Sequence, residues 1–156
     1  MISSVLPESD FVYSAGYVHA VDHEEGATKE ELLALTGYFN SFACDWWARR
    51  IVDRHVTSPL INNIPIPDWT EGQVDEVAEL AGELIHRGGT ETLPGGKVVP
   101  SNHGDLDEHE IRGRIEKVVA EGFGLDMSHY ESILTDFSGK ACPTELRTSI
   151  EEHIND

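Results

Sequence analysis

Residues 28–52 read TKEELLALTGYFNSFACDWWARRIV, and the spacing of their apolar residues predicts a long helix. Thr28 and Glu31 have the spacing of a capping box, in which each side chain accepts a hydrogen bond from the other residue's backbone N–H. Behind this box, apolar residues recur at intervals of three and four, which is the spacing of one helix face. These residues are Leu32, Leu35, Phe39, Phe42 and Trp46. We therefore expect one amphipathic helix from Lys29 to Val52 that packs through an aromatic face.

On both sides of this helix the sequence changes to patterns typical of extended chain. Residues 2–6 and 11–21 are rich in β-branched and aromatic residues, so we expect two short strands that pair with each other. After the helix, prolines forbid further helix, and the run from Leu60 to Ile66 is expected to form an edge strand. The predicted class is therefore α+β: a predominantly helical domain with a small β-sheet made of the N-terminal strand pair and the extended Pro-rich strand.

The chain is long enough for one domain with a core of its own, and we expect residues 1–156 to form a single unit. Residues 1–67 hold the strands and the long aromatic helix, and residues 68–156 form the helical part. Within the helical part, residues 88–104 are rich in Gly and Pro and predict a loop or a small hairpin.

Helices dominate the expected structure after residue 67, and each has its own signal of a start or of a buried face. The signals are, in order, Thr70 with Gln73, the apolar stripe from Ile111 to Val118, Ser128 with Glu131, and Pro143. The two cysteines are about a hundred residues apart, and Cys44 lies among helical aromatics, where buried free thiols are common. No disulfide is expected.

The charge of the chain is strongly negative, with 29 acidic and 11 basic residues and a net charge of -18. At about 1 M salt the Debye length falls to roughly 3 Å, so such a surface stays folded where it would repel itself in dilute buffer. The composition therefore predicts a halophilic protein of a very salty cytoplasm. The alternative is an acidic protein that mimics DNA or binds a basic partner.

Neither a secretion signal nor a membrane span is visible in the sequence. The first ten residues lack a basic start and an apolar stretch, and no run of about 18 apolar residues occurs. We expect a cytoplasmic protein that has no membrane contact.

One stretch differs from the acidic rest of the chain. Residues 36–67 hold three arginines against two aspartates, net +1, so a phosphate backbone would not be repelled there. Arginine, serine and threonine suit phosphates, and arginine and asparagine also bind base edges. The candidate DNA-binding residues are Arg49, Arg50, Arg54, Thr57, Ser58, Asn62 and Asn63. The alternative is that arginines at a helix C-terminus only complement the helix dipole.

Motifs of an autonomous enzyme are absent from the sequence. The chain has no Gly-rich phosphate loop, no nucleophile elbow and no metalloprotease helix, so we expect neither catalysis nor a cofactor. His103, Asp105, Asp107 and His109 have the residue types of a metal site, which leaves a small metal-dependent hydrolase as an alternative. The other interpretation is that the two aspartates cap the helix that follows.

Two quoted segments resemble the target-recognition region of adenine-specific DNA methylases, of fused restriction-methylation enzymes and of phage-defence methylases. The segment LALTGYFNSFACDWWAR, residues 33–49, is similar to the leucine-rich helix with an Asn-Ser step and an aromatic pair in that family. The segment TSPLINNIPIP, residues 57–67, resembles the strand that follows it. Residues 1–7 and 121–137 extend the resemblance in the same order, so it spans nearly the whole chain.

The resemblance implies double-stranded DNA as the partner, together with a methyltransferase or nuclease subunit. Methylases of this kind carry an Asn/Asp-Pro-Pro-Tyr/Phe motif and a loop for S-adenosylmethionine, and this sequence has neither. The resemblance thus implies a recognition fragment that reads DNA and catalyses nothing by itself. The alternative function is a protein-interaction or scaffold module that docks the methylase or nuclease and does not touch DNA.

Overall fold

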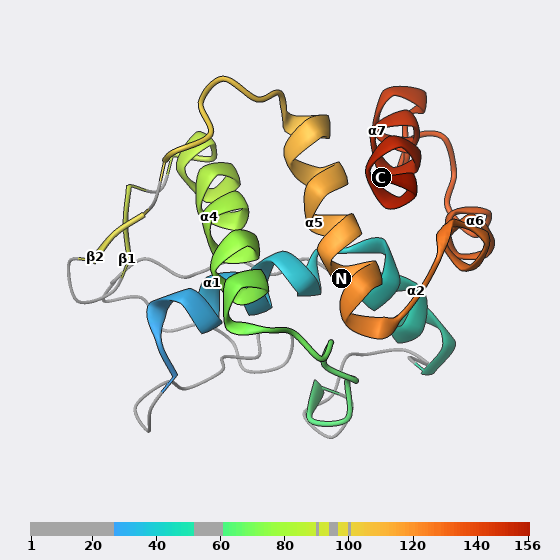
Figure 1. Ribbon diagram of the computed structural model, residues 1–156, viewed down its shortest axis with the longest axis horizontal. Coiled ribbons are helices and arrows are strands. Elements are labelled where there is room, and N and C mark those ends of the chain that lie inside the picture. Colours follow the sequence, from blue (N-terminus) through green and yellow to red (C-terminus); the bar gives the residue numbers. More distant parts are fainter. Residues whose placement is uncertain (1–26, 52–60, 90, 94–96, 100) are drawn as a thin grey trace, which may run out of the picture.

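The computed structural model of the protein describes residues 27–51, 61–89, 91–93, 97–99 and 101–156 (Figure 1). The helices of these residues are α1 (Lys29–Phe39), α2 (Phe42–Ile51), α4 (Glu71–Arg87), α5 (Glu108–Phe123), α6 (Met127–Leu134) and α7 (Thr144–Asn155). A hairpin follows α4, in which strand β1 (Thr92–Leu93) pairs antiparallel with β2 (Lys97–Val98).

The predicted α+β class is wrong for the described residues, whose regular secondary structure is helical apart from this short hairpin. The hairpin lies in the segment 88–104, where the Gly and Pro content predicted a loop or hairpin. The N-terminal strand pair, residues 2–6 and 11–21, lies outside the described residues.

The expected Pro-rich strand does not form in residues 61–67, because the backbone of this segment and of the next residues bonds to helices instead of a sheet. The Tyr38 hydroxyl on α1 donates to the Pro65 carbonyl at 2.5 Å. The Asp68 N–H donates to the Gly122 carbonyl at the end of α5, at 2.9 Å. Since proline has no N–H of its own, such isolated bonds satisfy the segment without a strand partner.

The predicted helix from Lys29 to Val52 begins where expected but is broken into α1 and α2. At its start the Glu31 N–H donates to the Thr28 hydroxyl at 3.1 Å and the Thr28 N–H to the Glu31 carboxylate at 2.7 Å, which confirms the capping box. The break falls at Asn40 and Ser41, where the Ser41 hydroxyl accepts the Cys44 N–H at 3.2 Å. Serine and asparagine compete for backbone groups in this way, so they favour helix ends over interiors.

Capping also sets the ends of the later helices. The Thr70 and Gln73 box at the start of α4 is confirmed, and that helix ends at Gly88. The expected start of α6 at Ser128 is wrong, since Asp126 caps this helix by accepting the His129 N–H at 3.1 Å. The Ser128 hydroxyl instead donates to Asp126 at 2.6 Å and is the main reason that the pKa of this carboxyl falls to about 2.

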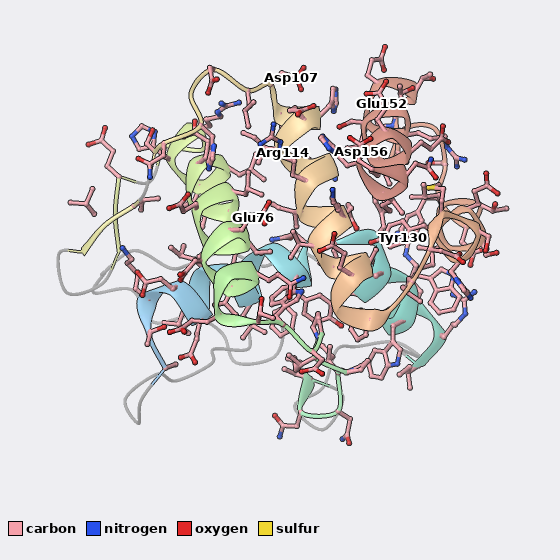
Figure 2. The ribbon with its side chains drawn as sticks, in the orientation of Figure 1. Glu76, Asp107, Arg114, Tyr130, Glu152 and Asp156 are labelled. Carbon is pink, nitrogen blue, oxygen red and sulfur yellow. The ribbon has the colours of Figure 1, made fainter. Side chains whose placement is uncertain are left out.

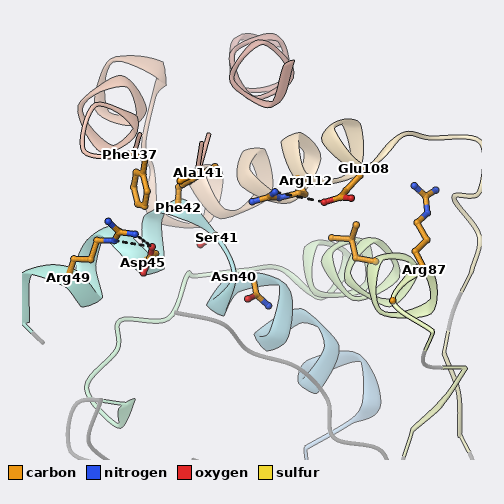
Figure 3. Close-up of a pocket in the computed structure, with 12 residues that line it drawn as sticks. Asn40, Ser41, Phe42, Asp45, Arg49, Arg87, Glu108, Arg112, Phe137 and Ala141 are labelled. Carbon is orange, nitrogen blue, oxygen red and sulfur yellow. Dashed lines mark hydrogen bonds and ion pairs between the residues drawn. The ribbon is translucent and has the colours of Figure 1, made fainter. Parts of the chain in front are cut away.

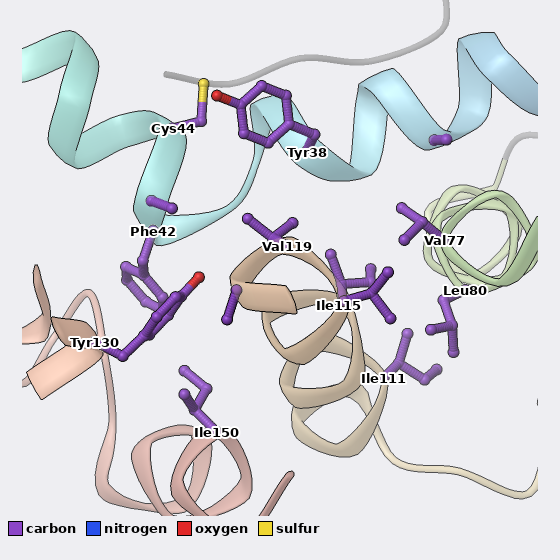
Figure 4. Close-up of a cluster of buried hydrophobic side chains, with 14 of the residues drawn as sticks. Tyr38, Phe42, Cys44, Val77, Leu80, Ile111, Ile115, Val119, Tyr130 and Ile150 are labelled. Atoms are coloured by element: carbon purple, nitrogen blue, oxygen red, sulfur yellow. The ribbon is translucent and has the colours of Figure 1, made fainter. Parts of the chain in front are cut away.

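Helix α5 lies at the centre of the core, with α4 on one side and α2, α6 and α7 on the other (Figures 1 and 4). Its buried Ile111, Ile115 and Val119 are the middle of one continuous apolar cluster. Cys44 and Cys142 are both buried free thiols, and burial raises the pKa of the Cys44 thiol to about 12. No helix in the described parts of the chain is long and apolar enough to cross a membrane.

Helices α5 and α7 approach each other closely at Gly113. A Cβ atom built at this position would lie 2.2 Å from the Ser149 hydroxyl oxygen and 3.1 Å from the Ser149 carbonyl carbon. The Ser149 hydroxyl occupies the space beside the glycine and donates to the His109 carbonyl at 3.0 Å. Glycine therefore permits the contact between the two helices.

The acidic excess is carried on the surfaces of several helices. Exposed carboxylates include Glu76 on α4, Asp107 at the start of α5 and Glu152 on α7 (Figure 2). Because these charges repel one another and are screened by ions, we expect the melting temperature to rise by at least about 5 °C between about 0.1 M and 2 M KCl. Thermal melts followed by circular dichroism measure this shift. A melting temperature that is unchanged or lower in 2 M KCl would exclude the halophilic interpretation.

Candidate nucleic-acid interface

The last turn of α2 presents two neighbouring arginines to solvent. The side chain of Arg49 is 55% exposed, and its guanidinium pairs with Asp45 at 2.9 Å, one turn earlier on the same helix. The same guanidinium lies over the ring of Phe137, with its carbon atom 4.5 Å from the ring centroid. An aromatic ring below and a carboxylate beside it fix the orientation of this cation.

Arg50 is held in the same manner by different partners. Its side chain is 48% exposed, and its guanidinium pairs with Asp136 at 2.8 Å. It also donates to the Trp46 carbonyl at 3.1 Å and lies 3.3 Å from the centroid of the Trp46 ring. The pair of Arg50 with Asp136 is thus exposed on both sides and contributes only about 0 to 1 kcal/mol, whereas in the pair of Arg49 only the arginine is exposed and Asp45 is half-buried.

Of the other predicted contact residues, the structure describes only Asn62 and Asn63. Arg54, Thr57 and Ser58 lie outside the described residues. Asn62 and Asn63 are exposed in a turn that follows Ile61. The structure therefore brings Arg49 and Arg50 together at the end of α2 and places the two asparagines on a separate turn.

A cleft of about 530 Å³ opens beside Arg49, between α2, α4, α5 and the connection from α6 to α7 (Figure 3). Its apolar lining is Phe42, Leu84, Phe137 and Ala141. Its charged lining is Asp45, Arg49, Arg87, Glu108 and Arg112. We call this the arginine cleft, because three of the seven arginines of the chain line it.

Two of these arginines, Arg87 and Arg112, were not among the residues predicted from sequence. Arg87 ends α4 and Arg112 lies in the first turns of α5, so only the packing of the helices brings them beside α2. Each sits in an ordinary amphipathic helix, next to acids at helical spacing, and no local pattern distinguishes it.

The two guanidinium groups differ in how they are held. Arg87 donates to Glu83 at 2.7 Å and to the carbonyls of His103 and Leu106 at 3.0 and 2.7 Å. The bond from Arg87 is also the main reason that the pKa of the buried Glu83 carboxyl is lowered. Arg112 pairs with Glu108 only at 3.9 Å, and its guanidinium carbon lies 5.9 Å from the centroid of the Phe42 ring.

Behind the cleft, a buried carboxyl fixes the N-terminus of α2. Glu116 accepts the Phe42 N–H at 2.9 Å with one oxygen, and the Tyr130 hydroxyl donates to the other. Burial raises the pKa of Glu116 to about 7, because the charged form loses its hydration. This carboxyl joins α2, α5 and α6 and thereby sets the position of Arg49 and Arg50 relative to Arg112.

The four residues of metal-ligand type before α5 and in its first turn, His103, Asp105, Asp107 and His109, do not form a group that could hold a metal ion. Asp107 caps α5 by accepting the Glu110 N–H at 2.8 Å, as the capping interpretation expected. The His103 ring lies 3.5 Å from Glu79 on α4. Among the residues that the structure describes, no group of three or more His, Cys, Asp or Glu side chains could hold a metal ion.

Comparison of the chain with protein-family models, with curated proteins and with solved structures gives no match. The similarity to the recognition regions of DNA methylases therefore has no support beyond the segments quoted above.

Proposed function

We propose that this protein is a DNA-recognition module of a restriction-modification or phage-defence methyltransferase system, acting in the cytoplasm without catalysis of its own. The observation that supports the proposal is the pair of exposed guanidinium groups of Arg49 and Arg50, each oriented on an aromatic ring at the end of α2. They lie in the stretch of residues 36–67, which is net positive in a chain of net charge -18. The partner is double-stranded DNA, and Arg54 follows on the same stretch.

The physical basis of the proposal is competition between phosphate and carboxylate. Asp45 and Asp136 pair with the two arginines when no DNA is present, and both guanidinium groups remain about half exposed to solvent. Like a carboxylate, a phosphate is an anion that can accept two parallel hydrogen bonds from the planar guanidinium group. In molar salt each phosphate contact contributes less, so contacts to bases and to DNA shape contribute a larger share of the affinity.

The variant with alanine at Arg49, Arg50 and Arg54 tests the proposal. We expect weaker binding to a duplex and a salt dependence whose slope is shallower by about one unit for each phosphate that the variant no longer binds. Fluorescence anisotropy of a labelled duplex, titrated over the range of KCl in which the protein is folded, measures both quantities.

A control of equal charge separates local contacts from general repulsion. A variant with alanine at Lys29, Arg114 and Lys117 also loses three positive charges, but from α1 and α5. We expect this control to bind the duplex more tightly than the arginine variant does. If both variants lose affinity equally while staying folded, the end of α2 is not the contact surface.

The alternative function is an interaction module that docks a methylase or nuclease subunit. The observation that favours it is the exposure of two large apolar side chains: Ile51, next to the arginines at the end of α2, is 50% exposed, and Ile66 is 58% exposed. Exposed apolar groups next to arginine are typical of protein interfaces. Wild-type protein that binds such a subunit and fails to bind any duplex in the same salt would select this alternative.

A further inference from the structure

The three arginines of the arginine cleft are separated from one another. Figure 3 shows Arg49 at one end, Arg112 near the middle and Arg87 at the other end, each from a different helix. Helices α2, α4 and α5 thus place three cations along one cleft of a strongly acidic protein. A row of separated cations suits a ligand that carries several anionic groups in succession.

Of the three arginines that line the cleft, Arg112 has the guanidinium group that is most available to donate hydrogen bonds to a ligand. Its side chain is 33% exposed, and the ion pair with Glu108 is long, at 3.9 Å. A guanidinium has five N–H donors, and hydrogen bonds to a charged group contribute about 1.5 to 3 kcal/mol each. Arg87 differs, because its bonds to Glu83 and to two carbonyls keep it in a fixed position at the end of the row.

We propose that the arginine cleft binds successive phosphate groups, with Arg112 as the central contact and Arg49 and Arg87 on either side. The source of the phosphates is the backbone of a DNA strand that continues from the end of α2, and in this respect the inference rests on the proposed function. A free polyphosphate or a nucleotide tail carries the same chemistry, and the experiment separates the two sources.

Glu108 makes the proposal testable by a gain of binding. Its side chain lines the cleft and pairs with Arg112, so it competes with any phosphate for that guanidinium. Glutamine at this position keeps the size of the side chain and removes the charge. A variant that binds more tightly cannot owe that result to loss of folding.

The test measures three single variants, Arg112→Gln, Glu108→Gln and Arg114→Gln, against wild type with two probes. Arg114 is the matched control, because it is on α5, pairs with Glu110 at 3.1 Å and does not line the cleft. The probes are tripolyphosphate, by calorimetry, and a duplex of about 20 base pairs, by anisotropy over a range of KCl. Melting temperatures in the same salt establish that each variant is folded.

We expect Arg112→Gln to weaken binding of both probes about tenfold and to make the salt slope for the duplex shallower by about one unit. Glu108→Gln should strengthen binding of both several-fold, and Arg114→Gln should match wild type. If the duplex binds through Arg49, Arg50 and Arg54 while Arg112→Gln and Glu108→Gln both match Arg114→Gln, the inference is overturned and the proposed function stands.

Two other outcomes separate the sources of phosphate. Binding of tripolyphosphate that depends on Arg112, without any binding of duplex, would overturn DNA as the ligand and the proposed function with it, and would retain the cleft as a site for a small polyphosphate. Absence of binding of either probe to folded wild-type protein overturns both proposals.

Discussion

The free energy of unfolding of the Glu116→Gln variant is expected to exceed that of wild type by about 2 to 3 kcal/mol above pH 7. The buried carboxyl has its pKa raised to about 7, against an ordinary value of 4.5, so the folded protein holds this proton more tightly than the unfolded chain does. Below pH 4.5 Glu116 is protonated in both the folded and the unfolded state, and its contribution to the free energy of unfolding is fully present. As the pH rises through 7 the contribution is lost, because the folded state must then bury a charge.

Glutamine is neutral at every pH and removes this dependence. Its amide oxygen can still accept the Phe42 N–H, and its amide nitrogen can donate to the Tyr130 hydroxyl oxygen. Urea denaturation of wild type and variant in about 2 M KCl, between about pH 5 and pH 8, gives the difference curve, in which histidine titrations shared by both proteins cancel. A difference that stays constant over this range would show that Glu116 is ionised in the folded protein throughout.

Glu83 is the matched control for this result. It is also buried on a helix, but its partner Arg87 lowers the pKa of its carboxyl, so the sign is opposite. The stability that Glu83 contributes is present above the ordinary pKa of a glutamate and is lost as the pH falls through the lowered value. Glu83→Gln should therefore destabilise the protein at pH 7, where Glu116→Gln stabilises it.

Valine at Gly113 is expected to destabilise the protein by about 3 kcal/mol, because overpacking forces apart two helices that touch at a glycine. The added Cβ would meet the Ser149 hydroxyl at 2.2 Å and the Ser149 carbonyl carbon at 3.1 Å. Serine can rotate its hydroxyl away only by losing the bond to the His109 carbonyl. Urea denaturation measures the loss.

Two further measurements serve as controls for the Gly113→Val variant: a double-mutant cycle with Ser149 and a substitution at a second glycine. Ser149→Ala removes the nearest atom, so it should recover part of the loss in the Gly113→Val background. At Gly72, in the first turn of α4, an added Cβ would have no neighbouring atom within 4 Å, and Gly72→Ala should stabilise by about 0.5 to 1 kcal/mol. If Gly113→Val leaves stability unchanged, the two helices do not pack as described.

The parts of the fold that were predictable from sequence are those set by neighbours along the chain. Thr28 and Thr70 cap helices through residues three positions away, and both boxes were visible as spacings. The break at Ser41 could not be predicted in this way. It frees the Phe42 N–H, and the partner of that N–H is Glu116, 74 residues later in the chain. An apolar stripe that runs unbroken through Asn40 and Ser41 gave no sign of this partner.

The predicted Pro-rich strand failed for a related reason. A short apolar run between prolines is compatible with an edge strand or with a segment that lies on helices, and only the tertiary partners separate the two. Here the partners are the Tyr38 hydroxyl, the Gly122 carbonyl and the Val118 carbonyl, which accepts the Trp69 indole N–H at 2.8 Å.

The candidate site divides in the same manner. Arg49 and Arg50 were predicted because they are adjacent in the one stretch without a negative charge excess. Asp136, the partner of Arg50, lies in the connection after α6, and Arg87 and Arg112, which line the cleft with Arg49, come from α4 and α5. No pattern within a single segment could therefore reveal the cleft.

The bond from Phe42 to Glu116 also has a consequence for the order in which the chain is made. Translation adds about 5 to 20 residues per second, so Glu116, which lies 74 positions after Phe42, is added about 4 to 15 s later. During that interval α2 has left or is leaving the ribosome without the carboxyl that holds its first N–H, and α6, which brings Tyr130, arrives later still. The last turn of α2, with both arginines, therefore reaches its final position only after the C-terminal half of the chain has emerged.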